Sequence, residues 1–425
     1  MRTTSQARLW ALAVLVIAVG ALPPVLRYLV FWPLDQWQVD VEVYRYAGVS
    51  LLSGRPVYQA LTESPQLLPF TYPPFAAILA IPLALLPFGV VGWLWTAGQV
   101  AANAAIVWYA AWRLIHRTGR WVPLTLALLT VPMLWLHPVS DGIRFGQVNA
   151  FMVLACLMDL RRPRPRLVRW LPPGVLVGLA MSVKLTPGVF VVHYLVNRRW
   201  REAAWAVGTA AAVTLASFVL LPEASFVFWG QALQDPNRLG PNFGTSNQAL
   251  RGFLLRVGPV GAAGTALWLA CVAVVGAFGF WLARRFYQRG DSIGEVAAVG
   301  LMAVLLSPVA WIHHLHWVVV VIFALLGAAP LVERRRLLYA GAVMAWFLAR
   351  MPWWGISWIS DRRSPAVVGR FLQNADTVGA LLALLLLWQV SRTAGPGRAP
   401  SPSTARPAAG TARPRPAGSS PVARA

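Results

Sequence analysis

The residues best suited to chemistry in this sequence begin just after its first apolar run. Asp40 and Tyr44 are four residues apart, so a helix would place a carboxylate and a phenol on one face. A carboxylate suits general-base work where water is excluded, because burial readily raises its pKa. Such an acid, followed by aromatic residues, can face a sugar; the alternative is an acid that only solvates a loop. The groups that we expect to contact a sugar in this stretch are Glu42, Tyr44, Tyr58 and Tyr72.

One cation stands apart from the other basic residues. Lys184 is the single lysine among 37 Lys and Arg residues, and it interrupts an apolar stretch shortly before Pro187. A cation in an apolar run costs about 2.5 to 3.5 kcal/mol on insertion scales, so it usually has a partner or a function. The half-length runs on either side cannot span alone, and their break should therefore line a cavity. We expect Lys184 to meet a phosphate as a point charge; the alternative is snorkelling to the membrane interface.

Three histidines follow a later apolar run, at His313, His314 and His316. Their spacing is not the i, i+4 pair of a helical zinc site, and no acid lies near them in sequence, so we predict no metal. An imidazole can donate a hydrogen bond or act as an acid near neutral pH, which favours contact with phosphate or sugar. Trp311, just before them, can stack on a sugar ring.

Gln147 and Asn149 are amides that enter an apolar run directly after Gly146. An unpartnered polar group is costly there, so these amides either bind a ligand or cross-link helices. Gly146 permits a close backbone turn.

A long polar segment later in the chain holds a second pair of amides and two arginines. Asn247 and Gln248 suit sugar hydroxyls, and Arg251 or Arg256 can pair with a donor phosphate. The alternative is an N-cap, because Ser246 or Asn247 can start the helix that follows.

The composition indicates the class of protein that carries these groups. Of the 425 residues, 58% are hydrophobic and 12% are charged, about half the charge of a typical soluble domain. The apolar content excludes disorder for most of the chain, and two cysteines in apolar runs exclude a disulfide-stapled secreted domain. The net charge of +23 does not indicate nucleic acid, because the arginines form short clusters between apolar runs. This charge layout is typical of a polytopic membrane protein.

We predict an all-α polytopic fold with roughly 10 to 13 transmembrane helices, short or broken ones included. The expected spans cover residues 9–30, 90–112, 121–137, 147–160, 203–221, 259–283, 295–310, 315–330, 337–350 and 377–391. Residues 74–88 are too short and proline-rich to cross fully, and 171–197 should enter and return around Lys184. No cleaved signal peptide is expected, since the first run exceeds an h-region and no cleavage site follows.

The distribution of charge predicts the orientation in the cell (plasma) membrane. Clusters between the spans and in the tail hold 25 of the 37 basic residues, and nine of the 14 acids fall on the opposite side. The positive-inside rule therefore puts both termini in the cytoplasm and the polar motifs outside. The outer segments would be loops, one of them at 137–147. Residues 1–392 form the membrane domain, and 393–425 form an Arg/Pro/Ala-rich cytoplasmic tail that should be disordered.

Taken in chain order, these motifs resemble the family 87 glycosyltransferases, the actinobacterial polyprenol-phosphate-mannose-dependent α-mannosyltransferases. The resemblance runs from Asp40 to Trp317. It rests on the motifs Asp40 with Gly54-x-x-x-Tyr58, Tyr72-Pro-Pro, Gly146-Gln-Val-Asn149, Gly178-Leu-Ala-x-x-x-Lys184-x-x-Pro187, Ser246-Asn-Gln248 and Ser307-Pro-x-x-Trp311-x-His-His314.

The resemblance implies a membrane enzyme with a GT-C fold. Such an enzyme takes a sugar, here mannose, from a polyprenyl-phosphate donor on the outer face. It implies a glycolipid or glycan acceptor among the membrane lipids. It also implies a catalytic role for the first-loop acid, Asp40, and for one of the pair His313 and His314, without deciding which. Our hypothesis is an inverting transfer, in which Asp40 deprotonates the acceptor hydroxyl and this hydroxyl attacks the sugar C1 in line. Lys184, together with one of the two histidines and with Arg251, would stabilise the leaving phosphate. This scheme requires no metal and no cofactor.

Three other functions remain open from the residues. A transporter or lipid flippase would also use a broken helix with an intramembrane cation, but it predicts inverted repeats, and we see none. A glycan polymerase or ligase with a lipid-diphosphate donor would also fit the arginines and histidines. A non-catalytic scaffold gives no reason for so many polar motifs. Arabinose instead of mannose is also open.

Overall fold

The computed structural model describes residues 2–31, 36–327, 332–361 and 365–393. The described chain is almost wholly helical, and its only β pairing consists of the isolated bridges Leu61 with Pro69 and Asn247 with Trp311. The all-α prediction is therefore confirmed for these residues. The predicted tail, from residue 394 onward, lies outside them.

Within the described residues, five helices are long and apolar enough to cross a membrane. They are α1 (Arg2–Phe31), α4 (Phe88–Ala110), α11 (Trp200–Leu220), α14 (Gly261–Gln288) and α20 (Ala375–Thr393). A sixth span results if α6 (Val122–Trp135) and α7 (His137–Phe145), which meet at a 78° bend, are counted together. The shorter apolar helices are α3 (Pro74–Ala84), α8 (Asn149–Leu160), α10 (Val189–Val196), α15 (Ser292–Leu305) and α16 (Val318–Leu326). The chain is therefore a multi-pass membrane protein in which many predicted spans are short helices.

The other helices are not among these spans and shorter apolar helices. They are α2 (Val39–Leu52), α5 (Trp112–His116), η2 (Gly119–Trp121), α9 (Val175–Val183), η3 (Thr186–Gly188), α12 (Pro222–Gly230), η4 (Ala232–Gln234), η5 (Pro236–Leu239), α13 (Leu250–Val257), η6 (Ile312–Trp317), α17 (Arg334–Leu348), α18 (Met351–Ser360) and α19 (Ala366–Gln373).

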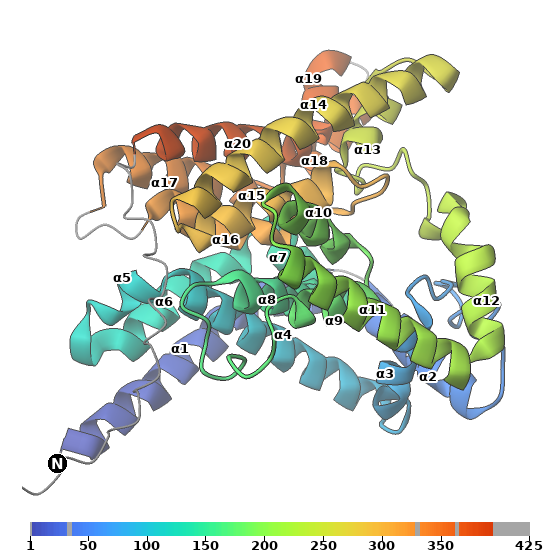
Figure 1. Ribbon diagram of the computed structural model, residues 1–425, viewed down its shortest axis with the longest axis horizontal. Helices are drawn as coiled ribbons and strands as arrows, with labels where there is room; N and C mark the ends of the chain where they lie inside the picture. The colour runs from blue at the N-terminus through green and yellow to red at the C-terminus, as the bar shows by residue number, and fades with distance from the viewer. Residues whose placement is uncertain (1, 32–35, 328–331, 362–364, 394–425) are drawn as a thin grey trace, which may run out of the picture.

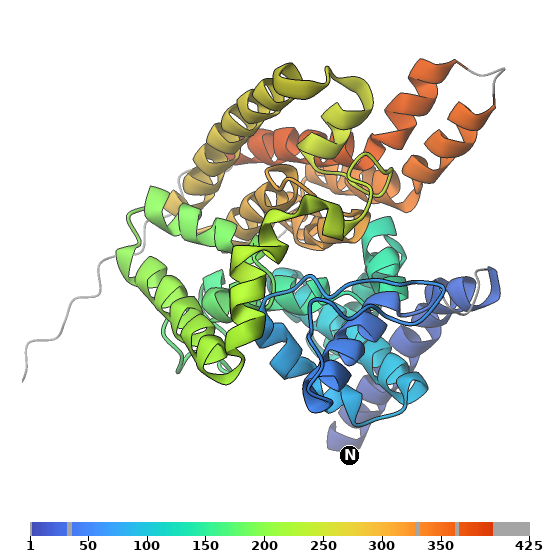
Figure 2. The ribbon, with the colours of Figure 1, turned by 90° about the vertical axis from the view of Figure 1, so that its right-hand side faces the viewer.

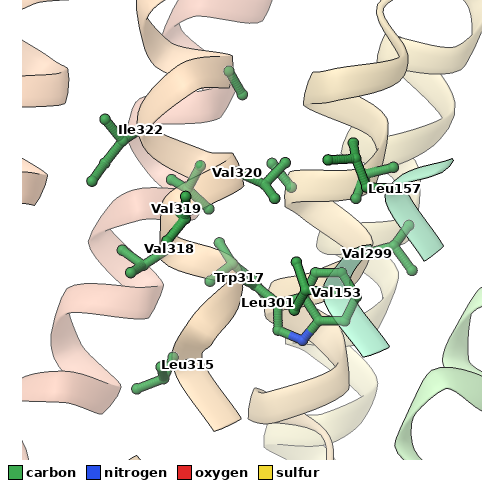
Figure 3. Close-up of a cluster of buried hydrophobic side chains, with 14 of the residues drawn as sticks. Val153, Leu157, Val299, Leu301, Leu315, Trp317, Val318, Val319, Val320 and Ile322 are labelled. Carbon is green, nitrogen blue, oxygen red and sulfur yellow. The ribbon is translucent and has the colours of Figure 1, made fainter. Parts of the chain in front are cut away.

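Helices α15 and α16 form the centre of the bundle. Every residue of α15 except Ile293 is buried, and apart from Ser292 and Glu295 in its first turn the helix is apolar on every face. Both helices contact α20 on one side, while α15 contacts α8 and α16 contacts α4 on the other (Figure 1). Trp317, at the end of η6, packs into this core among residues such as Val153 and Leu301 (Figure 3).

Helices α2, α3 and α12 gather at one end of the molecule, where α3 contacts both of the others (Figures 1 and 2). Helix α2 carries the Asp40 motif, one of the polar motifs that we predicted to lie outside the membrane. Helix α3 has 11 residues, too few to cross, as its proline content and length suggested.

The predicted break at Lys184 is present. Helix α9 ends at Val183, Lys184 is extended with φ −148° and ψ 127°, and η3 and α10 follow. A continuous helix would need a hydrogen bond from residue 187 to the carbonyl of Val183, and Pro187 has no N–H to donate. The backbone therefore leaves the helix where the lysine stands.

The expectation of an outer loop at 137–147 is wrong. Residues His137 to Phe145 form α7, and every residue from His137 to Arg144 is buried. Its polar side chains are buried because they have partners: His137 lies 3.2 Å from Asp376, and Arg350 donates to Ser140 at 2.5 Å. A sequence with this many polar groups resembles a loop until those partners are known.

Candidate active site

A cavity of about 910 Å³ opens between elements that are far apart in the sequence. Its walls come from α2, the segment before α3, α7, the break after α9, the 231–246 segment, α15 and η6. The charged and polar residues that line it include Asp40, Tyr72, Asp141, Gln147, Lys184, Arg238, Trp311, His313 and His314. Much of the remaining wall is apolar, for example at Leu185, Val189, Leu239 and Leu306.

The side-chain amide of Gln147 joins the predicted base to the predicted phosphate-binding cation. Its Nε2 donates to Asp40 Oδ2 at 2.5 Å, and its Oε1 accepts from Lys184 Nζ at 3.1 Å. Tyr72 donates to the same Oε1 at 3.2 Å. Because a carboxylate only accepts, the amide nitrogen must face Asp40, and this orientation turns Oε1 toward the two donors.

Lys184 is held by three groups from two segments, the start of α8 and η6. Besides Gln147, its Nζ contacts Asn149 Oδ1 at 3.0 Å and His314 Nε2 at 2.9 Å. Asn149 in turn donates to the carbonyl of His313 at 2.9 Å. The amides at 147 and 149 therefore cross-link helices and also define the surroundings of the lysine, so the two interpretations of these amides are compatible.

The three histidines of η6 have different partners. His314 faces Lys184, whereas His313 Nδ1 lies 3.3 Å from Asp141 Oδ2. The other ring nitrogen of His313, Nε2, is buried and has no hydrogen-bond partner among the described residues. His316 does not line the cavity, and its Nε2 lies 2.9 Å from Asn103 Oδ1. His313 and His314 thus line the cavity with separate environments.

Burial raises the pKa of the Asp40 carboxyl above its usual range. His313, the hydrogen bond from Gln147 and Lys184 act against this rise, and Asp141 adds to it. Helix α2, which carries Asp40, is not among the candidate spans. A carboxylate with a raised pKa is a stronger base, which suits general-base work near neutral pH.

The tyrosines of the first polar stretch form a cluster behind Tyr72. Tyr44 OH lies 3.0 Å from Tyr72 OH, and the two rings meet edge to face with their centroids 5.1 Å apart. Tyr58 OH donates to the carbonyl of Tyr72 at 2.8 Å. Burial raises the pKa of all three phenols, so they remain protonated donors. Only Tyr72 lines the cavity; Tyr44 and Tyr58 support it.

The N-terminus of α2, and with it Asp40, is fixed against the end of α7. Gln38 precedes α2 in the left-handed conformation at φ 58°, and its Nε2 donates to Ile143 O at 2.8 Å. Its backbone N–H donates to Arg144 O at 2.8 Å. Gly146 ends α7 with φ +72°, and a Cβ there would collide with the Gln38 side chain. The close turn expected at Gly146 is therefore present.

Comparison with known proteins identifies the family of the chain. Residues 70–308, more than half of the sequence, match the Glycosyltransferase family 87 profile. A Mycobacterium tuberculosis protein named polyprenol-phosphate-mannose-dependent alpha-(1-2)-phosphatidylinositol mannoside mannosyltransferase is 32% identical over 375 residues, which cover 84% of this chain and 86% of the relative. The chain belongs to glycosyltransferase family 87. The resemblance noted from its motifs is confirmed.

A Mycolicibacterium smegmatis member named polyprenol-phosphate-mannose-dependent alpha-(1-2)-phosphatidylinositol pentamannoside mannosyltransferase is 32% identical over 374 residues, covering 86% of this chain and 87% of the relative. The crystal structure of ArnT from Cupriavidus metallidurans bound to undecaprenyl phosphate aligns with 90% of this chain and 77% of that chain, at a TM-score of 0.37 and 16% identity. The GT-C type of fold is what membership of family 87 implies. The protein is a glycosyltransferase, which sets aside the transporter and scaffold alternatives.

Several residues predicted for the site of this family 87 enzyme do not line the cavity. Arg251 lies over the Trp268 ring at 4.9 Å, and Arg256 donates to Asn374 Oδ1 at 2.7 Å and 2.9 Å. Gln248 is fully buried and bonded to protein groups, including the backbone of Thr377. The others outside the lining are Glu42, Tyr44, Tyr58, Asn149 and Asn247.

Asn247 does not cap a helix, because α13 begins at Leu250 with Ala249 as its N-cap residue. Instead its Oδ1 accepts from the backbone N–H groups of Ala249 at 3.2 Å and Ala310 at 3.0 Å. This buried amide therefore ties the segment before α13 to the segment that carries Trp311 and the histidines.

Asp141 and Arg238 line the cavity but were missed as site residues. Asp141 lies in the stretch that we took for an outer loop, where an acid among several other polar residues gave no signal of its own. Arg238 lies in the same polar segment as Arg251 and Arg256, and nothing in the sequence separates the three. Among the described residues, no group of three or more His, Cys, Asp or Glu side chains could hold a metal ion.

Proposed function

We propose that this family 87 enzyme transfers mannose from polyprenol-phosphate-mannose to a glycolipid of the phosphatidylinositol mannoside type, at the outer face of the membrane. The names of its relatives support this donor and acceptor, since each relative is similar to this chain over more than four fifths of both sequences. The mixed lining of the cavity also suits such substrates, because both are lipids that carry a sugar and a phosphate.

The observation that carries the proposal is the bridge that Gln147 makes between Asp40 and Lys184. Transfer from a sugar phosphate needs a base for the attacking hydroxyl and a positive charge for the leaving phosphate. A rigid amide between a carboxylate and an amine holds these two functions at a fixed separation. Asp40 Oδ2 accepts from Gln147, which leaves Oδ1 for the acceptor hydroxyl.

In the proposed reaction, Asp40 takes the proton of the acceptor hydroxyl while its oxygen forms a bond to the mannose C1. The bond from C1 to the phosphate oxygen breaks at the same time, and its electron pair goes to the phosphate. Lys184 and His314 donate to the phosphate oxygens as their charge grows. Attack from the side opposite the phosphate inverts the configuration at C1. The products are the mannosylated acceptor and polyprenyl phosphate, and Asp40 returns its proton to water.

The charge distribution supports placing the reaction at the outer face. With the predicted spans, the polar motifs would lie on the side opposite the arginine clusters, where the positive-inside rule puts the extracytoplasmic surface. A cysteine introduced at the exposed Glu223 should react with a membrane-impermeant maleimide added to intact cells. Labelling only after the membrane is opened would place this end of the molecule in the cytoplasm.

The central test is transfer by Asp40→Asn in membranes supplied with polyprenol-phosphate-mannose. Loss of the base should lower the rate by about 10²- to 10⁴-fold. Glu223→Gln is a matched control, since it also converts an acid to an amide but at an exposed position outside the cavity. Transfer by Asp40→Asn at the wild-type rate would exclude Asp40 as the base. A wild-type enzyme that uses only a lipid-diphosphate sugar would favour the polymerase or ligase alternative.

A further inference from the structure

Arg238 reaches the cavity from η5, a segment that the proposed reaction does not use. One nitrogen of its guanidinium, Nη2, donates to the carbonyl of Tyr58 at 2.7 Å and lies 3.4 Å from the carbonyl of Phe70. Both carbonyls belong to the polar stretch that also carries Asp40 and Tyr72. The guanidinium is therefore anchored by one edge to the wall of the cavity.

The charge of Arg238 has no acidic partner within the described part of the chain. None of the ion pairs found there includes it, and its Nε is buried without any hydrogen-bond partner. The side chain as a whole is half-buried. A partly desolvated cation is costly unless an anion pairs with it. A guanidinium offers its N–H groups in a planar fork that matches the oxygens of a phosphate.

Lys184 and Arg238 are the only lysine and arginine among the residues that line the cavity. They have different surroundings: Lys184 lies among Gln147, Asn149 and His314, whereas Arg238 lies against the backbone of the first polar stretch. Under the proposed function Lys184 meets the phosphate of the donor. The second cation then has a second anion to bind, and a cavity of about 910 Å³ is large enough to hold more than one head group.

We propose that Arg238 binds the phosphodiester of the acceptor glycolipid, so that the enzyme selects an anionic phospholipid glycoside over a neutral glycoside with the same terminal sugar. This inference rests on the proposed function, because it needs the donor phosphate at Lys184. The acceptor class that it specifies is a mannoside attached to a glycerophospholipid through an inositol or similar ring. The phosphodiester would lie against Arg238 while the terminal mannose hydroxyl reaches Asp40.

A structural role is the alternative for Arg238, since its bonds to the carbonyls of Tyr58 and Phe70 also tie η5 to the first polar stretch. A tie of this kind would affect every substrate equally. Phosphate recognition would affect only the acceptor that carries a phosphate. The two roles are therefore separated by comparing acceptors, not by measuring total activity.

The experiment uses the full-length enzyme in nanodiscs with polyprenol-phosphate-mannose as donor. Two acceptors are compared: a phosphatidylinositol mannoside and an alkyl α-mannoside, which presents mannose without a phosphate. We expect Arg238→Gln to raise KM for the phosphatidylinositol mannoside by about tenfold to a hundredfold, the loss typical of a hydrogen-bonded charge. Its KM for the donor and its kcat/KM for the alkyl mannoside should stay within about twofold of wild type.

Arg238→Lys keeps the charge but loses the planar fork, so it should recover part of the lost acceptor affinity. Arg251→Gln is the matched control, because it removes an arginine of the same polar segment that lies outside the cavity. Arg251→Gln should leave KM unchanged for both the donor and the phosphatidylinositol mannoside. Turnover of the alkyl mannoside by Arg238→Gln also shows that the variant is folded.

Three results would overturn the inference. An equal loss with both acceptors, or a variant that does not fold while Arg238→Lys is normal with both, would give Arg238 a structural role. A raised KM for the donor alone would assign its charge to the donor phosphate. Failure of the proposed function looks different, because the wild-type enzyme would then not use polyprenol-phosphate-mannose with either acceptor.

Discussion

Lys184 Nζ lies 2.9 Å from His314 Nε2, while the other nitrogen of the same ring, Nδ1, accepts the backbone N–H of Trp311 at 3.2 Å. Because Nδ1 accepts, a neutral imidazole must carry its proton on Nε2. That N–H points at Lys184, which can accept it only as a neutral amine. The two N–H groups of the amine then donate to Gln147 Oε1 and Asn149 Oδ1, and every group has a matching partner.

An ammonium at Lys184 would set two N–H groups against each other on one side of His314. We therefore expect the lysine to be neutral before the donor arrives and protonated once a phosphate replaces His314 as its third partner. Binding of polyprenol-phosphate-mannose without acceptor should take up about one proton per donor, since ligand and proton binding are linked. Titration calorimetry in buffers of different ionisation enthalpy measures this number directly, because the phosphodiester itself does not titrate near neutral pH.

Lys184→Arg is the matched variant for the proton measurement. A guanidinium stays protonated throughout, so donor binding to this variant should take up no proton. Wild-type binding without proton uptake would mean that Lys184 is already an ammonium in the free enzyme. The asparagine and glutamine contacts would then surround a permanent charge.

The pH dependence of transfer should follow Asp40. A base works in its ionised form, and burial raises the pKa of this carboxyl, so kcat/KM should fall on the acid side at a higher pH than an ordinary aspartate would give. The hydrogen bond from Gln147 favours the charged form. Gln147→Leu should therefore shift the acid limb of the pH profile of kcat/KM to a higher pH, by about one to two pH units. A hydrogen bond to a charged group contributes roughly 1.5 to 3 kcal/mol, which corresponds to this shift.

The position of the acid limb is informative even where Gln147→Leu lowers the maximum rate. Glu223→Gln should keep the wild-type limb, because this exposed acid lies outside the cavity. A limb that stays in place in Gln147→Leu would show that the group titrating is not Asp40.

Gly146 should be a position where alanine destabilises the enzyme. Its φ of +72° strains any residue with a side chain, and an added Cβ would also collide with Val41 and Gln38, which position α2. Gly119 has a similar φ of +56° but has nothing within 4 Å of an added Cβ. We expect Gly119→Ala to cost roughly 1 to 2 kcal/mol and Gly146→Ala about 1 to 3 kcal/mol more, the cost of overpacking. Thermal unfolding in detergent measures the difference, and equal losses would mean that the contact with Gln38 relaxes freely.

The sequence predicted the parts of the site whose residue types are unusual for their surroundings. Lys184 in a broken apolar run and the amides beside Gly146 are costly in a membrane protein unless they have partners, and the structure brings them into one network. The roles proposed for Asp40, Lys184 and the histidines remain predictions. The buried helix α7 could not be predicted, because its polar residues gain their partners only from distant helices such as α18 and α20.

The choice among the arginines of the polar segment also depends on contacts that a sequence does not reveal. Arg238, Arg251 and Arg256 look alike in the chain, yet the first lines the cavity, the second lies over Trp268 and the third bonds Asn374. Amides behave in the same way, since Gln147 faces the cavity and Gln248 has all its contacts inside the protein.

Arg256 should support the fold and not the donor phosphate. Its guanidinium donates to Asn374 Oδ1 through Nε and Nη2 and to the carbonyl of Gly244 through Nη1 at 2.7 Å, which ties α13 to the end of α19. Arg256→Gln leaves these acceptors without their partner and should lower the free energy of unfolding by about 1 to 3 kcal/mol. Below its unfolding temperature, the variant should keep KM for polyprenol-phosphate-mannose within about twofold of wild type. Steady-state kinetics and thermal unfolding on the same preparation separate the two effects. A donor KM raised by tenfold or more in a folded variant would restore Arg256 to the phosphate site that the sequence first suggested.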